Sequence, residues 1–163
     1  MKYTKNFYQI KSNSEIFERL KAERENIGYY NLPYQDTAEI KKYAQSIAKK
    51  HIVVLGIGGS SLGARAIYEF LLPSNNYSKD LLFLETVDPL KINHCLKKVD
   101  LKDAQFVVIS KSGNTIETIS LFKYLNSLVE IDKSNCTIIS EAQSSLTQFA
   151  NDNNIKVFDL AEN

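Results

Sequence analysis

The sequence is short of cysteine and of long apolar runs. Its 163 residues include only two cysteines, Cys95 and Cys136, which lie far apart and have no CxxC neighbour. This usage is typical of reduced thiols in a cytosolic protein, and ordinary packing is their simplest role. No apolar stretch approaches the length needed to cross a bilayer, which excludes a membrane-spanning class. The N-terminal segment is too polar for a signal peptide and contains an acidic residue, which a transit peptide usually lacks, so we expect a cytoplasmic protein with no membrane partner.

Charge of one sign is not in excess either. The chain has 20 Lys and Arg against 19 Asp and Glu, a formal net charge of +1. Without a basic patch or an acidic tail, neither a nucleic acid nor a membrane surface has electrostatic support as a partner. Any anion must therefore be bound locally, by loops and helix ends.

With 163 residues, 44% of them hydrophobic, the chain is long enough to bury one substantial core.

Two regions of the chain differ in pattern. Residues 1–50 are polar with scattered aromatics, and we expect a helical arm there, with a helix beginning at Ser14, a turn over 28–33 and a helix after Asp36. Residues 51–163 form the predicted main domain, in which apolar β-branched runs alternate with segments of helical spacing. The predicted strands are 52–57, 81–87, 105–110, 136–140 and 156–160, and the helices between them are 61–72, 90–99, 115–129 and 144–153.

This alternation predicts the fold class. Apolar strands without polar alternation are expected where both faces of a sheet are covered. Strands that alternate with helices form right-handed βαβ units. We therefore expect an α/β fold: a doubly wound, five-stranded parallel sheet flanked by helices in three layers, of the flavodoxin-like kind.

Two loops each follow a predicted strand and lead into a predicted helix. The first reads GIGGSSLG, residues 56–63, and the second reads SKSGNTIET, residues 110–118. A helix N-terminus presents unpaired backbone N–H groups and the positive end of the helix dipole. Glycine lets the backbone approach an anion, and serine and threonine add hydroxyl donors. Two such loops at the carboxyl edge of one parallel sheet indicate a phosphorylated ligand held between them.

The first loop does not satisfy either common nucleotide-binding motif. A P-loop requires Lys and Ser or Thr where Ala64 and Arg65 stand. A dinucleotide fingerprint is nearer, but Ser61 takes the place of its third glycine. Glu85 and Asp88 also come late for the acidic residue that would bind the ribose. A purely structural turn would explain one glycine and leaves the others and the two serines unexplained.

The second loop carries three hydroxyls within six residues, those of Ser110, Ser112 and Thr115, directly before a long predicted helix. Together with convergent backbone N–H groups they match the three terminal oxygens of a phosphate. Lys111 could add a positive charge, or could face solvent while only its N–H contributes. The alternative is a well-capped helix with spare hydroxyls, whose N-cap is Thr115 or Asn114.

The pair GIGGSSLGARA (residues 56–66) and VISKSGNTIETI (residues 108–119) closely resembles the glucose-6-phosphate isomerase family. More broadly, residues 51–160 resemble a sugar isomerase (SIS) domain, a five-stranded parallel sheet flanked by helices. The resemblance implies interconversion of D-glucose 6-phosphate and D-fructose 6-phosphate, a step of glycolysis and gluconeogenesis, with no metal or organic cofactor. It also implies a homodimer for the full-length enzyme.

The resemblance further implies that six residues of the two loops bind substrate: Gly59, Ser60, Ser110, Lys111, Ser112 and Thr115. The first two would approach the sugar and the other four would bind its phosphate, Lys111 largely through its backbone. Glu117 matches a glutamate that lies near the substrate in the family, and a charge in the first turn of a helix is an equally simple role for it. Ser112 and Asn114 stand where relatives often have threonine, and both keep a polar side chain.

Residues for the isomerisation chemistry itself are missing. Proton transfer between C1 and C2 of a sugar needs a base, an acid that opens the ring and a positive group beside the enediolate. In the family these residues follow a segment that resembles residues 157–163, so no catalytic residue is expected in this chain. His51 and His94 have no family counterpart and are expected to be solvated or packed side chains. No triad, paired carboxylates or metal-ligand spacing stands out in the sequence.

We therefore expect the N-terminal segment of a glucose-6-phosphate isomerase, without its C-terminal half, that supplies the phosphate site and turns over no substrate alone. The end of the chain directly after a predicted strand favours this interpretation. Two alternatives remain: a free-standing phosphosugar-binding SIS module or regulator, and a nucleotide-binding subunit. A regulator would be expected to carry a DNA-binding helix, and residues 1–50 have neither a basic recognition helix nor the charge for one.

Overall fold

The computed structural model describes residues 14–24, 26–74 and 77–160, and the chain divides into two compact units. The first unit, Met1–Thr37 with Glu162–Asn163, contains helix α1 (Ser14–Glu23) and the 3-10 helix η1 (Gly28–Tyr34). The helix predicted from Ser14 is confirmed, and the turn predicted over 28–33 is helical. The second unit, Ala38–Ala161, contains the remaining elements. The division of the chain at residue 50 stays a prediction.

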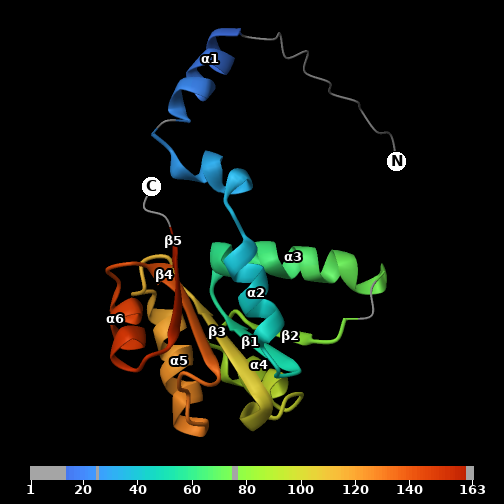
Figure 1. Ribbon diagram of the computed structural model, residues 1–163. Coiled ribbons are helices and arrows are strands. Elements are labelled where there is room, and N and C mark those ends of the chain that lie inside the picture. Colours follow the sequence, from blue (N-terminus) through green and yellow to red (C-terminus); the bar gives the residue numbers. More distant parts are fainter. Residues whose placement is uncertain (1–13, 25, 75–76, 161–163) are drawn as a thin grey trace. The chain divides into compact units, whose positions relative to one another are not determined.

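The second unit is built around one five-stranded sheet, in which every strand runs parallel to its neighbours (Figure 1). Its strands are β1 (His51–Leu55), β2 (Asp80–Leu84), β3 (Ala104–Ile109), β4 (Cys136–Glu141) and β5 (Lys156–Leu160). Their order across the sheet is β2-β1-β3-β4-β5. From the centre, the chain builds outward in one direction from β1 to β2 and in the other from β3 to β5. The predicted doubly wound parallel sheet is confirmed.

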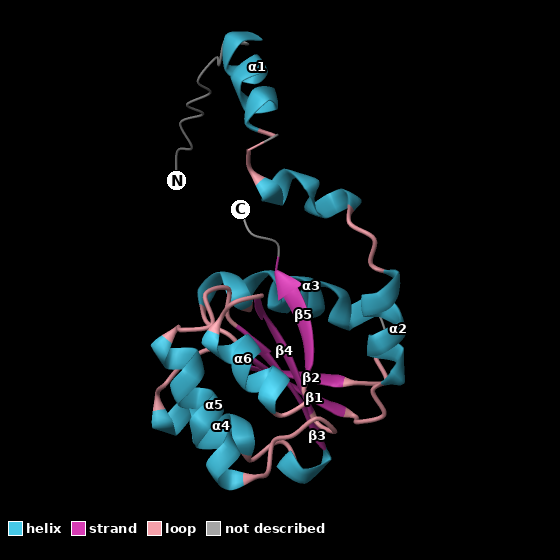
Figure 2. Cartoon of the chain, turned by 60° about the vertical axis from the view of Figure 1, so that its left-hand side comes forward, coloured by secondary structure: helices cyan, strands magenta, loops and turns pink. Residues whose placement is uncertain are grey.

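Helices cover both faces of the sheet, which explains why its strands are apolar without alternation. One face carries α2 (Ala38–Ser46) and α3 (Leu62–Leu71), and the other carries α4 (Pro89–Leu96), α5 (Ile116–Leu128) and α6 (Ser145–Asp152) (Figure 2). Each of the four helices predicted between strands is present, within a few residues of its predicted limits. Within the described ranges, no helix is both long and apolar enough to cross a membrane.

Two strands end more than one residue earlier than predicted. β1 ends at Leu55 rather than at residue 57, because Gly56 begins a tight connection into α3. β2 ends at Leu84 rather than at residue 87, because the chain turns there toward the start of α4. Asp88 caps that helix, and its carboxylate accepts hydrogen bonds from the N–H groups of Leu90 and Lys91.

The main core lies between the sheet and the layer formed by α4, α5 and α6. Its fully buried members from the strands and from α5 include Leu55, Phe106, Val108, Ile138, Leu121 and Leu125. Each such leucine or phenylalanine contributes roughly 1.5–3 kcal/mol by leaving water. α6 adds Leu146 and Ala150 to the same cluster. This core fixes the helices that follow β3 and β4, and therefore the starts of α5 and α6.

The opposite face attaches α2 to the sheet through polar contacts. The hydroxyls of Tyr43 and Thr137 lie 2.7 Å apart, and Gln105 Nε2 donates to the same threonine oxygen at 3.1 Å. Lys156 on β5 pairs with Glu39 at 2.7 Å. Because the Thr137 and Gln105 side chains are buried, these hydrogen bonds satisfy polar groups that would otherwise be costly on this face.

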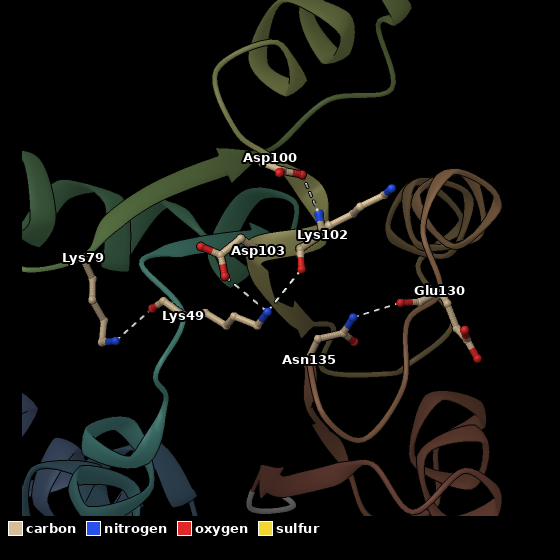
Figure 3. A network of polar contacts seen from close by, with 7 residues as sticks. All are labelled: Lys49, Lys79, Asp100, Lys102, Asp103, Glu130 and Asn135. Atoms are coloured by element: carbon tan, nitrogen blue, oxygen red, sulfur yellow. Dashed lines mark hydrogen bonds and ion pairs between the residues drawn. The ribbon is translucent and has the colours of Figure 1, made fainter.

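Lysines hold together the loops at the amino edge of the sheet (Figure 3). Lys79, directly before β2, donates from Nζ to the carbonyl oxygens of Lys49 at 2.9 Å and Ile47 at 2.5 Å. Lys49 in turn donates from Nζ to Asp103 Oδ1 at 3.3 Å and to the carbonyl oxygen of Lys102 at 3.2 Å. These contacts join the residues that precede β1, β2 and β3. The amino edge is thus occupied by structural contacts, and the two glycine-containing loops lie at the carboxyl edge.

Cys136 offers a test of the core. Its side chain is fully buried on β4, and burial raises the pKa of its thiol to about 12, whereas Cys95 on α4 is only half-buried. The thiolate is the reactive form, so a raised pKa suppresses reaction. We expect a maleimide at mildly alkaline pH to modify Cys95 and to leave Cys136 intact in the native protein, as read by peptide mass spectrometry. In urea both should react; native labelling of Cys136 as fast as of Cys95 would contradict this packing.

Candidate functional site

The two glycine-containing loops meet where the winding of the sheet reverses. β1 and β3 are hydrogen-bonded neighbours, and Leu55 at the end of β1 is level with Val108 of β3. The helices that follow these two strands, α3 and α5, lie on opposite faces of the sheet (Figure 2). In open α/β sheets such a switch point is where ligands bind, because the diverging connections leave a crevice.

The first loop starts at Gly56, where a side chain would be crowded by its neighbours. A Cβ at Gly56 would lie 3.0 Å from the Cβ of Ser60 and 3.3 Å from the carbonyl oxygen of Ile109, the last residue of β3. Both distances are shorter than ordinary contacts, so the backbone of this loop passes directly against the neighbouring strand. This close approach brings the first loop beside the start of the second.

Beyond Gly56 the first loop turns tightly into α3. Gly58 has a φ of +59°, a conformation that favours glycine, and a 3-10 turn, η2 (Gly58–Ser60), follows. Ser61 is fully buried, and its Oγ lies 3.4 Å from the carbonyl oxygen of Gly58, which closes the turn. Gly59 is exposed and Ser60 is half-buried, so both predicted residues are accessible to a ligand.

The second loop runs from Ser110, directly after β3, to Thr115, the N-cap residue of α5. Ser110 is only 1% exposed, and its hydroxyl donates to Thr115 Oγ1 at 3.1 Å. The side chain of Thr115 makes no capping hydrogen bond to its own helix. Its hydroxyl is therefore oriented by Ser110 and keeps its own hydrogen to donate. The interpretation of this loop as a capped helix with spare hydroxyls loses its main support here.

Lys111 and Ser112 are both exposed on the second loop. Lys111 Nζ lies 3.9 Å from Glu141 Oε1, so the ammonium is drawn toward the end of β4. Ser112 Oγ accepts a hydrogen bond from the N–H of Asn114 at 3.3 Å, and it too keeps its hydrogen free to donate. This placement of Lys111 favours a contribution through its backbone N–H over one through its side chain.

The carbonyl groups of the second loop are bound by the neighbouring residues 140–145, which we call the β4–α6 connection. Ser110 O accepts from Ser140 Oγ at 2.7 Å, and Lys111 O accepts from the N–H of Glu141 at 3.0 Å. Ser145 Oγ lies 2.9 Å from the carbonyl oxygen of Gly113. Three carbonyl groups of the loop thus have donors among the residues of this connection.

Three N–H groups of the same loop are left for a ligand. Those of Lys111, Ser112 and Thr115 have no acceptor in the described part of the chain. The first-turn N–H groups of α5 directly follow them, and such groups have no partner within their own helix. A run of unpaired N–H groups that leads into a helix N-terminus is a ready site for an anion. The arrangement can therefore bind a phosphate with backbone donors and the hydroxyls of Ser112 and Thr115.

Arg65, on the first turn of α3, is not free to bind an anion. Its guanidinium donates to Glu69 at 2.7 Å and to Glu85 at 2.6 Å, and these two hydrogen bonds raise the pKa of Arg65 above its usual value. Glu85 directly follows β2, so the pair joins α3 to the end of the edge strand. We assign Arg65 a structural role at the margin of the crevice.

Glu117, His51 and His94 are the remaining residues singled out in the sequence, and their positions give little indication of a function. Glu117 is half-buried in the first turn of α5, where a negative charge is favourable whatever its further role. His51 begins β1 at the amino edge, with Nδ1 3.5 Å from Asp80 Oδ2, and His94 is exposed on α4. Neither histidine belongs to the two loops, which agrees with the expectation that they are solvated or packed side chains.

Sequence reasoning missed the β4–α6 connection. Ser144 was expected only as the start of a helix, and Ser140 only as the end of a strand. The signal that could have found them is their neighbourhood: residues 140–145 contain three serines directly after a strand that follows the second loop's helix. Serines at the carboxyl end of an adjacent parallel strand are within reach of the preceding loop.

Comparison with known proteins agrees with the motifs. A family model described as phosphoglucose isomerase matches residues 35–160. The glucose-6-phosphate isomerase of Campylobacter jejuni is 33% identical over 146 residues, which cover 85% of this chain and 36% of that protein. That of Methanocaldococcus jannaschii is 34% identical over 140 residues, covering 84% and 33%. This chain thus spans about a third of the length of these relatives.

Solved structures support the same fold. A hypothetical protein from Thermus thermophilus superposes with a TM-score of 0.76 at 27% identity, covering 90% of this chain and 38% of that one. A glucose-6-phosphate isomerase from Chlamydia trachomatis superposes with a TM-score of 0.64 at 24% identity, covering 96% and 29%. At that identity the second likeness supports the fold alone.

Gly113 provides the first test of the loop geometry. Its φ is +65°, and a Cβ there would overlap the side chain of Ser144. We expect Gly113→Ala to lower the free energy of unfolding, measured with urea, by roughly 1–3 kcal/mol. Gly59→Ala is the matched control, because a Cβ at Gly59 meets no atom within 4 Å; its effect should stay within about 0.5 kcal/mol. Equal effects of the two substitutions would contradict the described loop.

Proposed function

Because the chain belongs to the phosphoglucose isomerase family, we propose that its two loops bind a hexose phosphate. The observation that carries this proposal is the second loop: its carbonyl groups are bound by the β4–α6 connection, while three of its N–H groups have no acceptor in the described residues. A balanced overall charge means that this local donor set, rather than a broad positive surface, must attract the anion.

The phosphate would be bound by the second loop. The N–H groups of Lys111 and Ser112 and the hydroxyls of Ser112 and Thr115 would donate to its oxygens, with the N-terminus of α5 behind them. Ser110 is buried and donates to Thr115, so its part would be to orient that hydroxyl. These contacts need no metal, since backbone and hydroxyl donors suffice to bind a phosphate dianion.

The sugar would lie toward the first loop. Gly59 is accessible and has no neighbouring atom where a side chain would begin, so a ligand can approach the backbone there. Ser60 is half-buried beside it and offers a hydroxyl to the sugar. Glu117, in the first turn of α5, would be near the same ligand, and we propose it as a substrate-proximal residue.

In a longer enzyme the same site would serve isomerisation of D-glucose 6-phosphate and D-fructose 6-phosphate. Ring opening and proton transfer between C1 and C2 through a cis-enediol require a base, an acid and a positive group, and we assign none of these to this chain. Its part would be to fix the phosphate so that the sugar carbons are held against groups supplied by the rest of the protein. Such an enzyme would be a cytoplasmic homodimer of glycolysis and gluconeogenesis.

A second candidate is a free-standing phosphosugar-binding module. The chain spans about a third of the relatives it matches (36% and 33% of two of them), and the proposed contacts are contacts of binding alone. The two candidates share the same ligand and differ in whether a catalytic partner segment exists.

Two hydroxyls test the site. We expect glucose 6-phosphate to shift the amide resonances of the second loop in an NMR titration, and Ser112→Ala combined with Thr115→Ala to abolish these shifts, because both proposed side-chain donors are then lost. Ser127→Ala is the control: Ser127 lies at the far end of α5, and its hydroxyl donates to the carbonyl of Tyr124. Undiminished shifts in the double variant would show that the phosphate binds elsewhere.

Turnover tests the division of labour. In a coupled dehydrogenase assay with fructose 6-phosphate, we expect no isomerase activity above background from this chain, even at substrate concentrations that saturate the NMR shifts. The reason is that we assign neither the base nor the acid of this reaction to the residues of this chain. Measurable activity that disappears in the Ser112→Ala, Thr115→Ala double variant would overturn this expectation and place catalytic groups within these residues.

A further inference from the structure

The β4–α6 connection makes none of the proposed contacts with substrate, yet it determines how the second loop presents its donors. Ser140 is 0% exposed, and its Oγ lies 2.7 Å from Ser110 O, 3.4 Å from Lys111 O and 2.7 Å from Ser144 Oγ. A hydroxyl has one hydrogen to donate. Of the two carbonyl oxygens, the nearer, Ser110 O, is its acceptor, and Ser144 Oγ is a further hydrogen-bonding neighbour.

The geometry of the peptide bond converts this contact into an orientation. In a trans peptide the C=O and the following N–H point in opposite directions within one plane. Because Ser110 O is directed at Ser140, the N–H of Lys111 must point away from the β4–α6 connection. The N–H of Glu141 binds Lys111 O at 3.0 Å and orients the N–H of Ser112 in the same manner. These two N–H groups are among those without an acceptor in the described chain.

Ser145 acts on the other end of the loop. Its Oγ lies 2.9 Å from Gly113 O and 2.6 Å from Asn114 Oδ1, directly before Thr115. Gly113 packs so closely on this connection that a Cβ there would lie 3.0 Å from Ser140 Oγ and overlap Ser144. The loop therefore packs on the connection through Ser110, Lys111, Gly113 and Asn114.

We propose that Ser140 and Ser145 are positioning residues of the phosphate site: Ser140 binds the carbonyl group of Ser110 so that the N–H of Lys111 faces the ligand, and Ser145 binds the Gly113–Asn114 segment directly before Thr115. This inference rests on the proposed function for the identity of the ligand. It goes beyond the proposed function by assigning a role in phosphate affinity to residues at the end of β4 and the start of α6, which make none of the proposed contacts with substrate.

The test compares three variants that each remove one hydroxyl. Ser140→Ala and Ser145→Ala each remove one proposed positioning contact. Ser140 is buried, whereas Ser145 is exposed, so we expect Ser145→Ala to leave the fold intact. Thr137→Val is the matched control, because Thr137 is a buried hydroxyl residue of the same strand whose partners, Gln105 and Tyr43, lie on the opposite face. Thermal unfolding gives the stability of each, and NMR titration gives the dissociation constants for inorganic phosphate and for glucose 6-phosphate.

We expect Ser140→Ala to weaken both ligands by the same factor, about three- to tenfold, the range that one hydrogen bond supplies. Ser145→Ala should weaken them by about two- to fivefold on the same ground. Thr137→Val should lower stability while both dissociation constants stay within about twofold of the unaltered chain. A purely structural role for Ser140 predicts the opposite: lost stability with unchanged affinity in the folded protein. That result in both serine variants overturns the proposal.

Hydrogen exchange separates this proposal from the proposed function. If the unaltered chain binds neither phosphate nor glucose 6-phosphate, the proposed function fails, and the positioning claim is judged on the ligand-free protein. The N–H of Gly113 donates to Ser110 O at 3.1 Å, and that of Glu141 donates to Lys111 O. In Ser140→Ala both amides should exchange severalfold faster, with no such change in Thr137→Val. Unaltered exchange at both amides would show that Ser140 does not hold the loop.

Discussion

The reversal of winding between β1 and β3 is the constraint on which the rest of this structure depends. All five strands are parallel and each helical connection is a crossover, so the strand order β2-β1-β3-β4-β5 sends α3 to one face and α5 to the other. Among neighbouring strands of this sheet, only β1 and β3 are followed by connections that lead away from each other, one toward β2 and the other toward β4. The two loops with glycines and hydroxyls follow these two strands, and their proximity is thus a consequence of topology rather than of any contact between their side chains.

Within that frame, the orientation of single peptide groups decides what the edge of the sheet can bind. Parallel strands end in carbonyl and N–H groups of both kinds, which by themselves favour neither anion nor cation. Here Ser140 and Glu141 bind the carbonyl groups of Ser110 and Lys111, and the N–H groups of Lys111 and Ser112 in the same peptide groups have no acceptor in the described chain. Glycine at positions 56 and 113 permits the close packing that this requires, because a Cβ at either position would lie 3.0 Å or less from a neighbouring side-chain atom.

The fold could be predicted almost completely from the sequence. Each predicted strand and helix is present because apolar runs and helical spacing are local signals, and the parallel sheet follows from their alternation. The early end of β2 was not predicted, since the apolar Val87 extends the run past Leu84 while the capping of α4 by Asp88 depends on the turn between them. Both loops could also be located by motif.

The tertiary contacts of the site could not be predicted. They are the burial of Ser110 behind Thr115, the hydrogen bonds of Arg65 with Glu69 and Glu85, and the packing of the second loop on the β4–α6 connection. These depend on contacts between residues distant in sequence.

The central claim is that the two loops at this switch point form one divided site, with phosphate at the second loop and sugar at the first. The most direct measurement compares amide shift maps of the labelled protein with inorganic phosphate and with glucose 6-phosphate. The account predicts that phosphate alone perturbs residues 110–118, and that glucose 6-phosphate perturbs these and also residues 58–63. Identical maps for the two ligands, or shifts confined to other parts of the chain, would contradict it.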